Sequence, residues 1–321
     1  MEIYIPNSAF LGNINGFLEK IDLSNPESLK ITANQKWVSI HPLVLCLIGA
    51  LGKNIQNKNI HCDTLLAPSA HYLKRMKLFD FIGVTPNIKN ITEHEAVGRF
   101  IPLTQVKNSN DLDLFLKDLV PLLHFSDNKK HVQSIQHIFS ELIRNVIEHS
   151  SSSNGAIVCS QYFKKSNKIS IGVVDTGIGL KKSLQASYKV EDDKEAIRLA
   201  LTPGVTGTTS RPGGTAQNAG FGLFLIKSIA FIGGDFFNII SGNQMYKLLQ
   251  RKNASLKLNG NPFDDRHSMA QVPFWSGVAV GVDISLDKTI QFSSLLDQIY
   301  GFYSKEVKGQ KKARYKKPKF K

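Results

Sequence analysis

Residues 173–180 read VVDTGIGL, so an apolar strand runs directly into Asp175 and is followed by Gly177 and Gly179. A carboxylate at a strand end can accept a hydrogen bond from a ligand's exocyclic amine, and glycines let the backbone approach that ligand closely. The segment lacks the third glycine of the Rossmann fingerprint, and no G-x-x-x-x-G-K-[ST] sequence occurs in the chain, which excludes a P-loop. Taken alone, VVDTGIGL predicts either a ligand-binding turn of another type or an ordinary Asp-Thr-Gly turn.

The segment before this turn contains ELIRNVIEH (141–149). Apolar residues recur there at three- and four-residue spacing, which predicts a long amphipathic helix over 129–149. Glu141, Asn145 and Glu148 project from one stripe that borders the apolar face. An isolated pattern of this kind is common on exposed helix faces, so it gains meaning only from its neighbours.

The segment after the turn holds six glycines within 202–222 (TPGVTGTTSRPGGTAQNAGFG), which we call the lid loop. It ends at GFGLFLI, the predicted start of a helix over 222–232, and the amides at a helix N-terminus can hold phosphate. A glycine-rich segment of this length is typical of a mobile lid, and equally of a flexible surface loop.

The order of these elements is more specific than any one of them. An acid–Asn helix, a D-x-G-x-G turn about 30 residues later, the lid loop and a closing strand over 278–284 follow one another. Further strands are expected over 156–163 and 169–174, paired as a hairpin, and over 236–241 and 245–249. This arrangement, over about 128–286, resembles the GHKL family of ATP-binding domains. That family has the Bergerat fold, an α+β sandwich, and includes gyrase, the ninety-kilodalton heat-shock chaperone, mismatch-repair ATPases, histidine kinases and anti-sigma kinases.

The resemblance implies a site for ATP and Mg²⁺. It implies that Glu141 is the general base, that Asn145 binds Mg²⁺ and that Asp175 accepts from the adenine amino group. The remaining residues implied to contact the nucleotide are Gly177 and Gly179 at the base, Gly220 and Gly222 at the phosphates, and Thr206 and Thr209 in the lid loop. Two neighbours on the helix, Arg144 and Glu148, are expected to support the site or the fold.

The sequence departs from the family pattern in two places. Gly277-Val278 stands where relatives often carry Gly-Thr, which leaves the threonine contact to adenine in doubt. Residues 287–321 are too few for the transducer domain that supplies phosphate-binding lysines in gyrase-like and mismatch-repair-like proteins. A sensor histidine kinase carries its phosphoacceptor histidine on a dimerisation domain well before the acid–Asn helix. His131 and His137 instead lie on the same helix as Glu141, which disfavours this class, and we expect both to be structural or exposed.

The N-terminal region resembles a STAS domain, the fold of anti-anti-sigma factors. Its pattern predicts a strand over 29–40, a helix over 42–51 that opens on Pro42, a strand over 60–66 and a helix over 70–81. Ser39 lies nearest to the serine that this family phosphorylates, but His41-Pro42 replaces the usual neighbouring residues. A helix cap or a plain strand-end residue is the alternative for Ser39.

The predicted fold class is therefore a two-domain α/β protein. The boundaries that we expect are a STAS-like module over 1–95, a connector and bridging helix over 96–127, the GHKL domain over 128–290, and a helix with a basic tail over 291–321. Within the connector, 93–110 shows little pattern and 112–124 reads as an apolar helix between the domains.

Composition sets limits on this reading. The 321 residues are 42% apolar and 21% charged, as in globular proteins, and no apolar run is long enough for a membrane span. The first residues do not read as a secretory signal, and the three cysteines form no CxxC pair, so we expect a cytoplasmic protein with free thiols. Residues 305–321 hold nine Lys or Arg against one acid, which is +8 of the net +14. This tail is either a nucleic-acid contact or a solvated tail.

These observations predict an ATP-driven regulatory switch with either ATPase activity or anti-sigma-type protein serine kinase activity. A protein partner is expected, and dimerisation is common among relatives, although the sequence identifies no interface. Two alternatives stay open. One is a nucleic-acid-associated or defence or stress effector gated by ATP, and the other is a binding module that does not catalyse.

Overall fold

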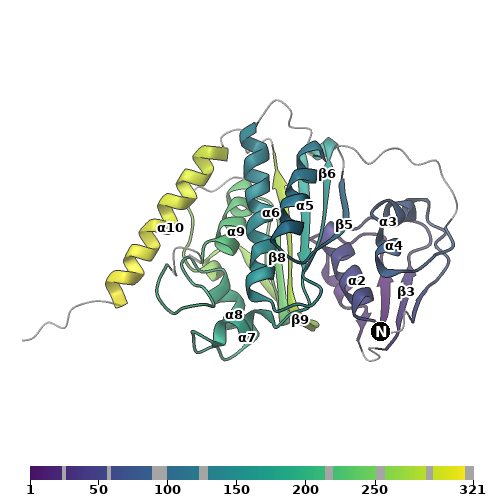
Figure 1. Ribbon diagram of the computed structural model, residues 1–321, viewed down its shortest axis with the longest axis horizontal. Helices are drawn as coiled ribbons and strands as arrows, with labels where there is room; N and C mark the ends of the chain where they lie inside the picture. Colours follow the sequence, from purple (N-terminus) through teal and green to yellow (C-terminus); the bar gives the residue numbers. More distant parts are fainter. Residues whose placement is uncertain are drawn as a thin grey trace, which may run out of the picture.

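A computed structural model describes residues 1–23, 27–55, 59–88, 100–122, 129–213, 220–250, 257–286 and 292–314. These residues form helices around two β-sheets, and the sheets lie side by side (Figure 1). The matching prediction of a mixed α/β architecture is confirmed. The STAS resemblance of the first sheet stays a prediction.

The larger sheet has five antiparallel strands in the order β5-β6-β7-β9-β8. Their bounds are β5 Phe100–Val106, β6 Ala156–Phe163, β7 Lys168–Val174, β8 Phe237–Leu248 and β9 His267–Ser285. The predicted hairpin of β6 and β7 is confirmed. Strand β7 is central and buried along most of its length, and it ends one residue before Asp175.

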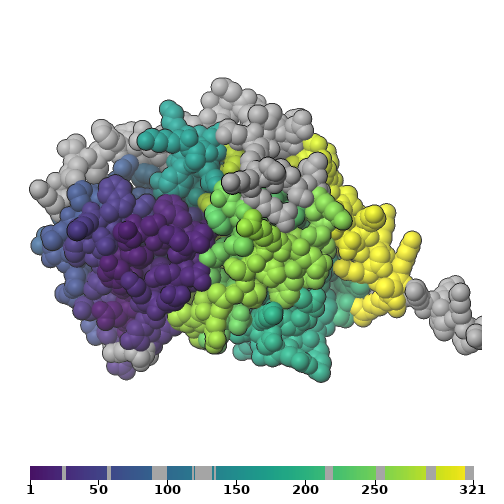
Figure 2. All heavy atoms as spheres, turned by 180° about the vertical axis from the view of Figure 1, so that it is seen from behind, coloured from purple at the N-terminus to yellow at the C-terminus, as the bar shows by residue number. Residues whose placement is uncertain are grey.

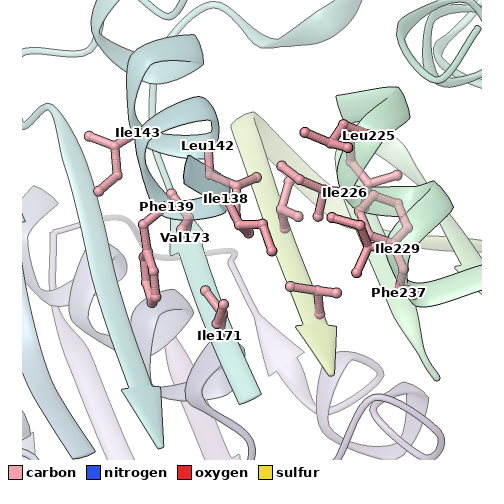
Figure 3. Packing of buried hydrophobic residues seen from close by; sticks show 14 of the residues in the cluster. Ile138, Phe139, Leu142, Ile143, Ile171, Val173, Leu225, Ile226, Ile229 and Phe237 are labelled. Atoms are coloured by element: carbon pink, nitrogen blue, oxygen red, sulfur yellow. The ribbon is translucent and has the colours of Figure 1, made fainter. Parts of the chain in front are cut away.

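Helices cover one face of this sheet (Figure 1). They are α5 Ser109–Leu122, α6 Lys129–His149, α7 Gly179–Gln185, α8 Asp193–Ala200 and α9 Gly222–Gly233. The apolar stripe of α6 and the apolar side of α9 face β7 and β8 across a buried core, in which Phe139, Ile171 and Ile229 are at most 2% exposed (Figure 3). The amphipathic pattern over 129–149 therefore forms the helix that it predicts.

The N-terminal module holds a four-stranded mixed sheet in the order β2-β1-β3-β4. Its elements are β1 Glu2–Ile5, α1 Asn15–Leu18, β2 Ile21–Asp22, β3 Leu29–Ala33, α2 Pro42–Asn54, β4 Ile60–Cys62, η2 Pro68–Ala70, α3 His71–Arg75 and α4 Leu78–Ile82. Helix α2 begins at Pro42, as predicted, and the His41 side chain caps it by accepting from the Leu43 amide at 3.0 Å.

Helix α2 packs on the face of the large sheet that α6 and α9 leave open. Gly172 of β7 and Gly281 of β9 are cross-strand partners there. A Cβ on Gly172 would lie 2.5 Å from the Leu43 amide nitrogen, and one on Gly281 would lie 2.6 Å from the Leu11 side chain. The two glycines therefore let the module sit directly on the strands, and Figure 2 shows the module and the β8–β9 region packed together.

Buried polar contacts also join the module to the large sheet. The Nε2 atom of His41 lies 3.3 Å from Asp283 Oδ1, and the Ser170 hydroxyl donates to the same oxygen at 2.5 Å. Lys247 of β8 donates to Asn15 at 2.6 Å. Residues of both parts share one hydrophobic core, so the two are a single packed unit.

The last helix, α10 Phe292–Arg314, lies at the opposite end of the molecule from the N-terminal module (Figure 1). It includes the first half of the basic segment predicted as a tail, whereas 315–321 lie outside the described residues. Among the described residues, no helix combines the length and apolarity that a membrane crossing needs.

Several predicted elements differ from the structure. The unpatterned segment 93–110 contains strand β5, which has a regular partner in β6 and is recognisable only through that pairing. The helix predicted to bridge the domains is α5, which packs on α6 through Phe115 and Phe139 rings 5.3 Å apart. The two strands predicted over 236–249 are one strand, β8, with an irregular register near Gly242.

The N-terminal elements are also shorter than their patterns predict. The strand predicted over 29–40 ends at Ala33, and the strand predicted over 60–66 ends at Cys62. The helix predicted over 70–81 is broken into α3 and α4, because Lys77 adopts a left-handed conformation with φ 57°. Both short helices nevertheless bury apolar residues in the module core, Leu73 from α3 and Leu78, Phe79 and Ile82 from α4.

Candidate functional site

A cavity of about 290 Å³ opens between α6, the start of α7, the lid loop and the start of α9. Tyr300 of α10 also lines it. The cavity lies on the helix-covered side of the sheet and thus faces away from the N-terminal module. It includes most of the residues that the sequence motifs single out.

The acid–amide pair of α6 forms one wall of the cavity. Glu141 and Asn145 are one helical turn apart and both reach the first residue of α9, Gly222. A Cβ on Gly222 would lie 2.7 Å from Glu141 Oε2 and 3.1 Å from Asn145 Nδ2, so the N-terminus of α9 is in direct contact with the pair. The Asn145 Nδ2 atom is buried and has no hydrogen-bond partner among the described residues, which leaves this amide free for a ligand.

Asp175 forms the deep end of the cavity and is 2% exposed. Its Oδ1 atom accepts from the Gly177 amide at 2.8 Å, and its backbone carbonyl accepts from the Trp275 indole at 2.9 Å. Burial raises the pKa of Asp175 to about 6, although the amides of Gly177 and Val278 act in the opposite direction. Among the described residues, no cationic side chain forms an ion pair with Asp175, so a ligand donor is the natural partner of its carboxylate.

The glycines after Asp175 shape the turn in two different ways. Gly179 has φ +74° and begins α7, where a Cβ would lie 2.7 Å from the Ser276 carbonyl oxygen. Gly177 does not line the cavity but packs on the end of α6, where a Cβ would lie 1.9 Å from the Ser150 carbonyl oxygen. The turn is thus fastened between α6 and β9.

A serine that sequence reasoning missed completes this fastening. The Ser241 hydroxyl accepts from the Leu180 amide at 3.0 Å and donates to the Gly277 carbonyl at 2.9 Å. It ties the first turn of α7 to both β8 and β9. Nothing in the local sequence marks Ser241, since its partners are 61 and 36 residues away.

The described parts of the lid loop, 202–213 and 220–222, lie over the cavity. The Gly204 amide donates to the Gly220 carbonyl at 3.1 Å, which closes the two ends of the loop on each other. Gly220 has φ +65°, and a Cβ there would lie 2.3 Å from the Val205 carbonyl oxygen. Thr206 is 6% exposed and lines the cavity.

Not every predicted site residue reaches the cavity. Those that line it are Glu141, Asn145, Asp175, Gly179, Thr206, Gly220 and Gly222, together with the supporting residues Arg144 and Glu148. Thr209 lies outside its wall, and its hydroxyl accepts from the Arg211 amide at 3.2 Å. Val278 lines the cavity where relatives often place a threonine.

Several lining residues were not predicted. Among them are His149, Ser183 and Tyr300, and His137, which we expected to be structural or exposed, also lines the cavity. His137 shares the helical stripe of Glu141 one turn earlier, a signal that the sequence offered. Tyr300 had no such signal because it enters from a distant helix. The side chain of His131 lies outside the described residues.

The donor set fits a magnesium nucleotide. An asparagine amide and a carboxylate are oxygen ligands of the kind that Mg²⁺ accepts, and they lie beside backbone amides at the start of α9. A buried acceptor, Asp175, lies at the other end of the same cavity. A nucleotide whose adenine lies at Asp175 and whose phosphates lie at the start of α9 would occupy both parts of the cavity.

Comparison with known families gives an independent result. Residues 130–244 match the model of the family described as histidine kinase-, DNA gyrase B-, and HSP90-like ATPases. The match runs from α6 into β8 and includes the acid–amide pair, Asp175 and the lid loop. A search of curated proteins finds no match to the chain. The part of the chain that supplies most of the cavity wall is therefore similar to histidine kinase-, DNA gyrase B- and HSP90-like ATPases.

Proposed function

We propose that this protein is a Mg-ATP-dependent regulatory switch that transfers the γ-phosphoryl group of ATP either to water or to a protein serine. The observation that carries the proposal is a single cavity. It is lined both by Asp175, a buried carboxylate with no ionic partner among the described residues, and by an acid–amide pair that lies against a helix N-terminus. Domains of this family are ATPases and generally bind ATP with Mg²⁺, which supports the same reading.

At the base end, the Asp175 carboxylate would accept a hydrogen bond from the adenine amino group. Its Oδ1 atom is oriented by the Gly177 amide at 2.8 Å, and the Trp275 indole fixes its backbone. Since both contacts come from the protein, the acceptor is positioned before the ligand arrives. Such preorganisation favours binding, because little of the binding free energy is used to order the site.

At the phosphate end, the amides at the start of α9 would bind phosphate oxygens, and Asn145 would hold Mg²⁺. The metal ion would neutralise charge on the phosphates. Glu141 is placed to accept the proton of an attacking water or serine hydroxyl. The Glu141 carboxylate comes within contact distance of the α9 N-terminus, so base and phosphate-binding amides act at the same point.

The switch would be read out by the lid loop and by a partner. The N-terminal module shares a continuous core with the large sheet and lies on the face opposite the cavity. Undocking it would expose that core, which makes the module an unsuitable moving part. The lid loop, in contrast, lines the cavity through Val205, Thr206 and Gly220, so a bound nucleotide would contact it directly.

The test is to incubate the purified chain with Mg²⁺ and γ-labelled ATP and to follow the label. Label released as phosphate, and lost in Glu141→Ala, would establish an ATPase. Label retained on protein would establish a kinase and identify the acceptor by peptide mapping. Asp175→Asn should weaken ATP binding in either case, and failure of the parent chain to bind ATP would refute the proposal.

A nucleic-acid effector gated by ATP is the second candidate. Lys305, Lys308 and Lys312 are exposed along α10, which gives this helix a cationic outer side. Deleting 305–321 would also remove contacts that α10 makes to the lid loop, so replacing Lys305, Lys308 and Lys312 with glutamate is the better test. Unchanged polynucleotide binding and salt dependence in that variant would rule this candidate out.

A further inference from the structure

Helix α10 packs its aromatic side chains on the start of α9. The Tyr300 ring stacks on Phe221 with centroids 4.5 Å apart and an angle of 19°, and Tyr303 meets the same ring edge-on at 4.9 Å. Phe302 stacks on Phe224 at 5.9 Å. Phe221 directly precedes Gly222, so α10 supports the helix start that lies against Glu141 and Asn145.

One turn further along, Val307 fits between two glycines of the lid loop. A Cβ on Gly204 would lie 2.7 Å from one Val307 methyl group, and a Cβ on Gly213 would lie 2.6 Å from the other. Both glycines have φ +79°, and the Gly213 amide donates to the Gly204 carbonyl at 2.9 Å. Val307 is 7% exposed, so this apolar contact is closed to water.

Polar contacts extend the attachment toward the end of α10. Gln310 Nε2 donates to the Pro203 carbonyl at 3.1 Å, and Arg314 donates to the Ser210 hydroxyl at 3.3 Å and to the Ser210 carbonyl. Three successive turns of α10 thus hold the segment from Pro203 to Gly213.

Helix α10 also supplies part of the cavity wall. Tyr300 lines the cavity, and its hydroxyl lies 3.4 Å from His137 Nε2 on α6, one turn before Glu141. Its ring remains 42% exposed, so it lies at the open side of the cavity and not in the core. This is the end at which α9 and Glu141 meet.

We propose that α10 is a built-in clamp of the nucleotide site, in which Val307 holds the lid loop over the cavity and Tyr300 positions the phosphate end of the nucleotide. The inference rests on the proposed function for the identity of the ligand. Because α10 holds the loop without a ligand, less ordering remains to be done when the nucleotide binds, and affinity rises.

The first experiment compares Val307→Asp with the neighbouring Lys308→Asp, which also introduces an aspartate but on the exposed side of α10. In the nucleotide-free protein, hydrogen exchange at the Gly204 and Gly213 amides should accelerate in Val307→Asp and stay at the parent rate in Lys308→Asp. With Mg²⁺ and ATP, calorimetry should give about tenfold weaker binding for Val307→Asp and little change for its control. Parent-like exchange in Val307→Asp, or tighter ATP binding, would overturn the clamp.

The second experiment uses an exposed residue and therefore does not depend on whether Val307→Asp folds. Tyr300→Ala removes the stack on Phe221 and should weaken ATP binding roughly tenfold, with unchanged thermal unfolding. Tyr300→Phe keeps the ring and should restore binding. If Tyr300→Ala binds ATP as the parent does, Tyr300 has no positioning role.

Failure of the clamp can be told apart from failure of the proposed function. A parent chain that binds no ATP contradicts the proposed function, whereas the exchange measurement on nucleotide-free protein still decides whether Val307 holds the lid loop. A parent that binds ATP, with variants that bind equally well, contradicts only the clamp.

Discussion

On both faces of the large sheet, glycines allow a close approach, but what approaches differs between the two faces. On the module side, Gly172 and Gly281 admit Leu43 and its helix, and the space that they leave is filled by protein. On the cavity side, Gly222 brings the start of α9 against Glu141, and the space beside it stays open. A glycine in the sequence thus predicts a close approach but does not say whether protein or ligand approaches.

Two buried aspartates, Asp283 on the module side and Asp175 on the cavity side, also differ in their electrostatic surroundings. Burial raises the pKa of both, but for Asp283 the His41 and Ser170 contacts outweigh it and hold the pKa below its usual value. Among the described residues Asp175 has only backbone partners, and its pKa remains raised at about 6. The carboxylate that the protein leaves without an ionic partner is the one in the cavity, as expected of a group that awaits a ligand.

The largest loss of stability should come from a glycine substitution on the module side. Gly172→Ala places a methyl group 2.5 Å from the Leu43 amide and 2.7 Å from the Pro42 carbonyl carbon, so backbone must separate from backbone. We expect the free energy of unfolding to fall by about 3 kcal/mol, measured by urea denaturation. A loss of under about 1 kcal/mol would show that the module does not sit tightly on the sheet.

The matching change on the cavity side should affect turnover and not stability. In Gly222→Ala the atoms nearest to the new methyl group are the ends of the Glu141 and Asn145 side chains, at 2.7 and 3.1 Å, and these ends can move. We expect ATP turnover to fall about tenfold to a hundredfold, because the base and the amide are displaced, while urea denaturation changes little. Equal losses of stability in Gly222→Ala and Gly172→Ala would break the comparison between the two faces.

Removing the buried negative charge of Asp175 should stabilise the nucleotide-free protein. The pKa of Asp175 is raised from 3.8 to about 6, so the folded state binds its proton more tightly than the unfolded state does. Stability is therefore lost as pH rises from about 4 to about 6 and stays lower above that range. Asp175→Asn keeps an acceptor for the Gly177 amide and should gain about 1–2 kcal/mol at pH 7.

The control for this prediction is the pH profile. The stability difference between Asp175→Asn and the parent should grow between about pH 4 and pH 6 and then level off. ATP binding by the parent should weaken below about pH 6, where the protonated carboxyl is a poorer acceptor. A difference in stability that does not change with pH would mean that charge is not the cause.

The smallest change in stability should come from substituting a glycine that has no close neighbour. Gly309 lies inside α10, and a Cβ there would have no neighbour within 4 Å. Gly309→Ala should stabilise the protein by about 0.5–1 kcal/mol through helix propensity and leave ATP binding unchanged, as thermal melts and calorimetry would show. A destabilisation would contradict the open, regular helix surroundings of Gly309 in the structure.

Sequence reasoning was most successful where chemistry is local. The helix over 129–149, the hairpin of β6 and β7 and the helix that begins at Gly222 follow from periodicity, turn residues and glycine. Glu141, Asn145 and Asp175 all line one cavity, and their roles remain proposals. Strand β5 was missed because its pairing partner, β6, is distant in the sequence. The break at Lys77 was missed because a lysine does not signal a left-handed backbone.

By itself, the sequence determined which residues carry charge, hydrogen-bonding groups or backbone freedom, and in which order they occur, since side-chain chemistry and helical spacing are local properties. Only the tertiary structure decided which approach each glycine serves: α2 on Gly172, Val307 on Gly204, and an open cavity beside Gly222. The physical reason is that packing joins residues more than a hundred positions apart through contact and the exclusion of water, and no local pattern encodes the identity of such a neighbour.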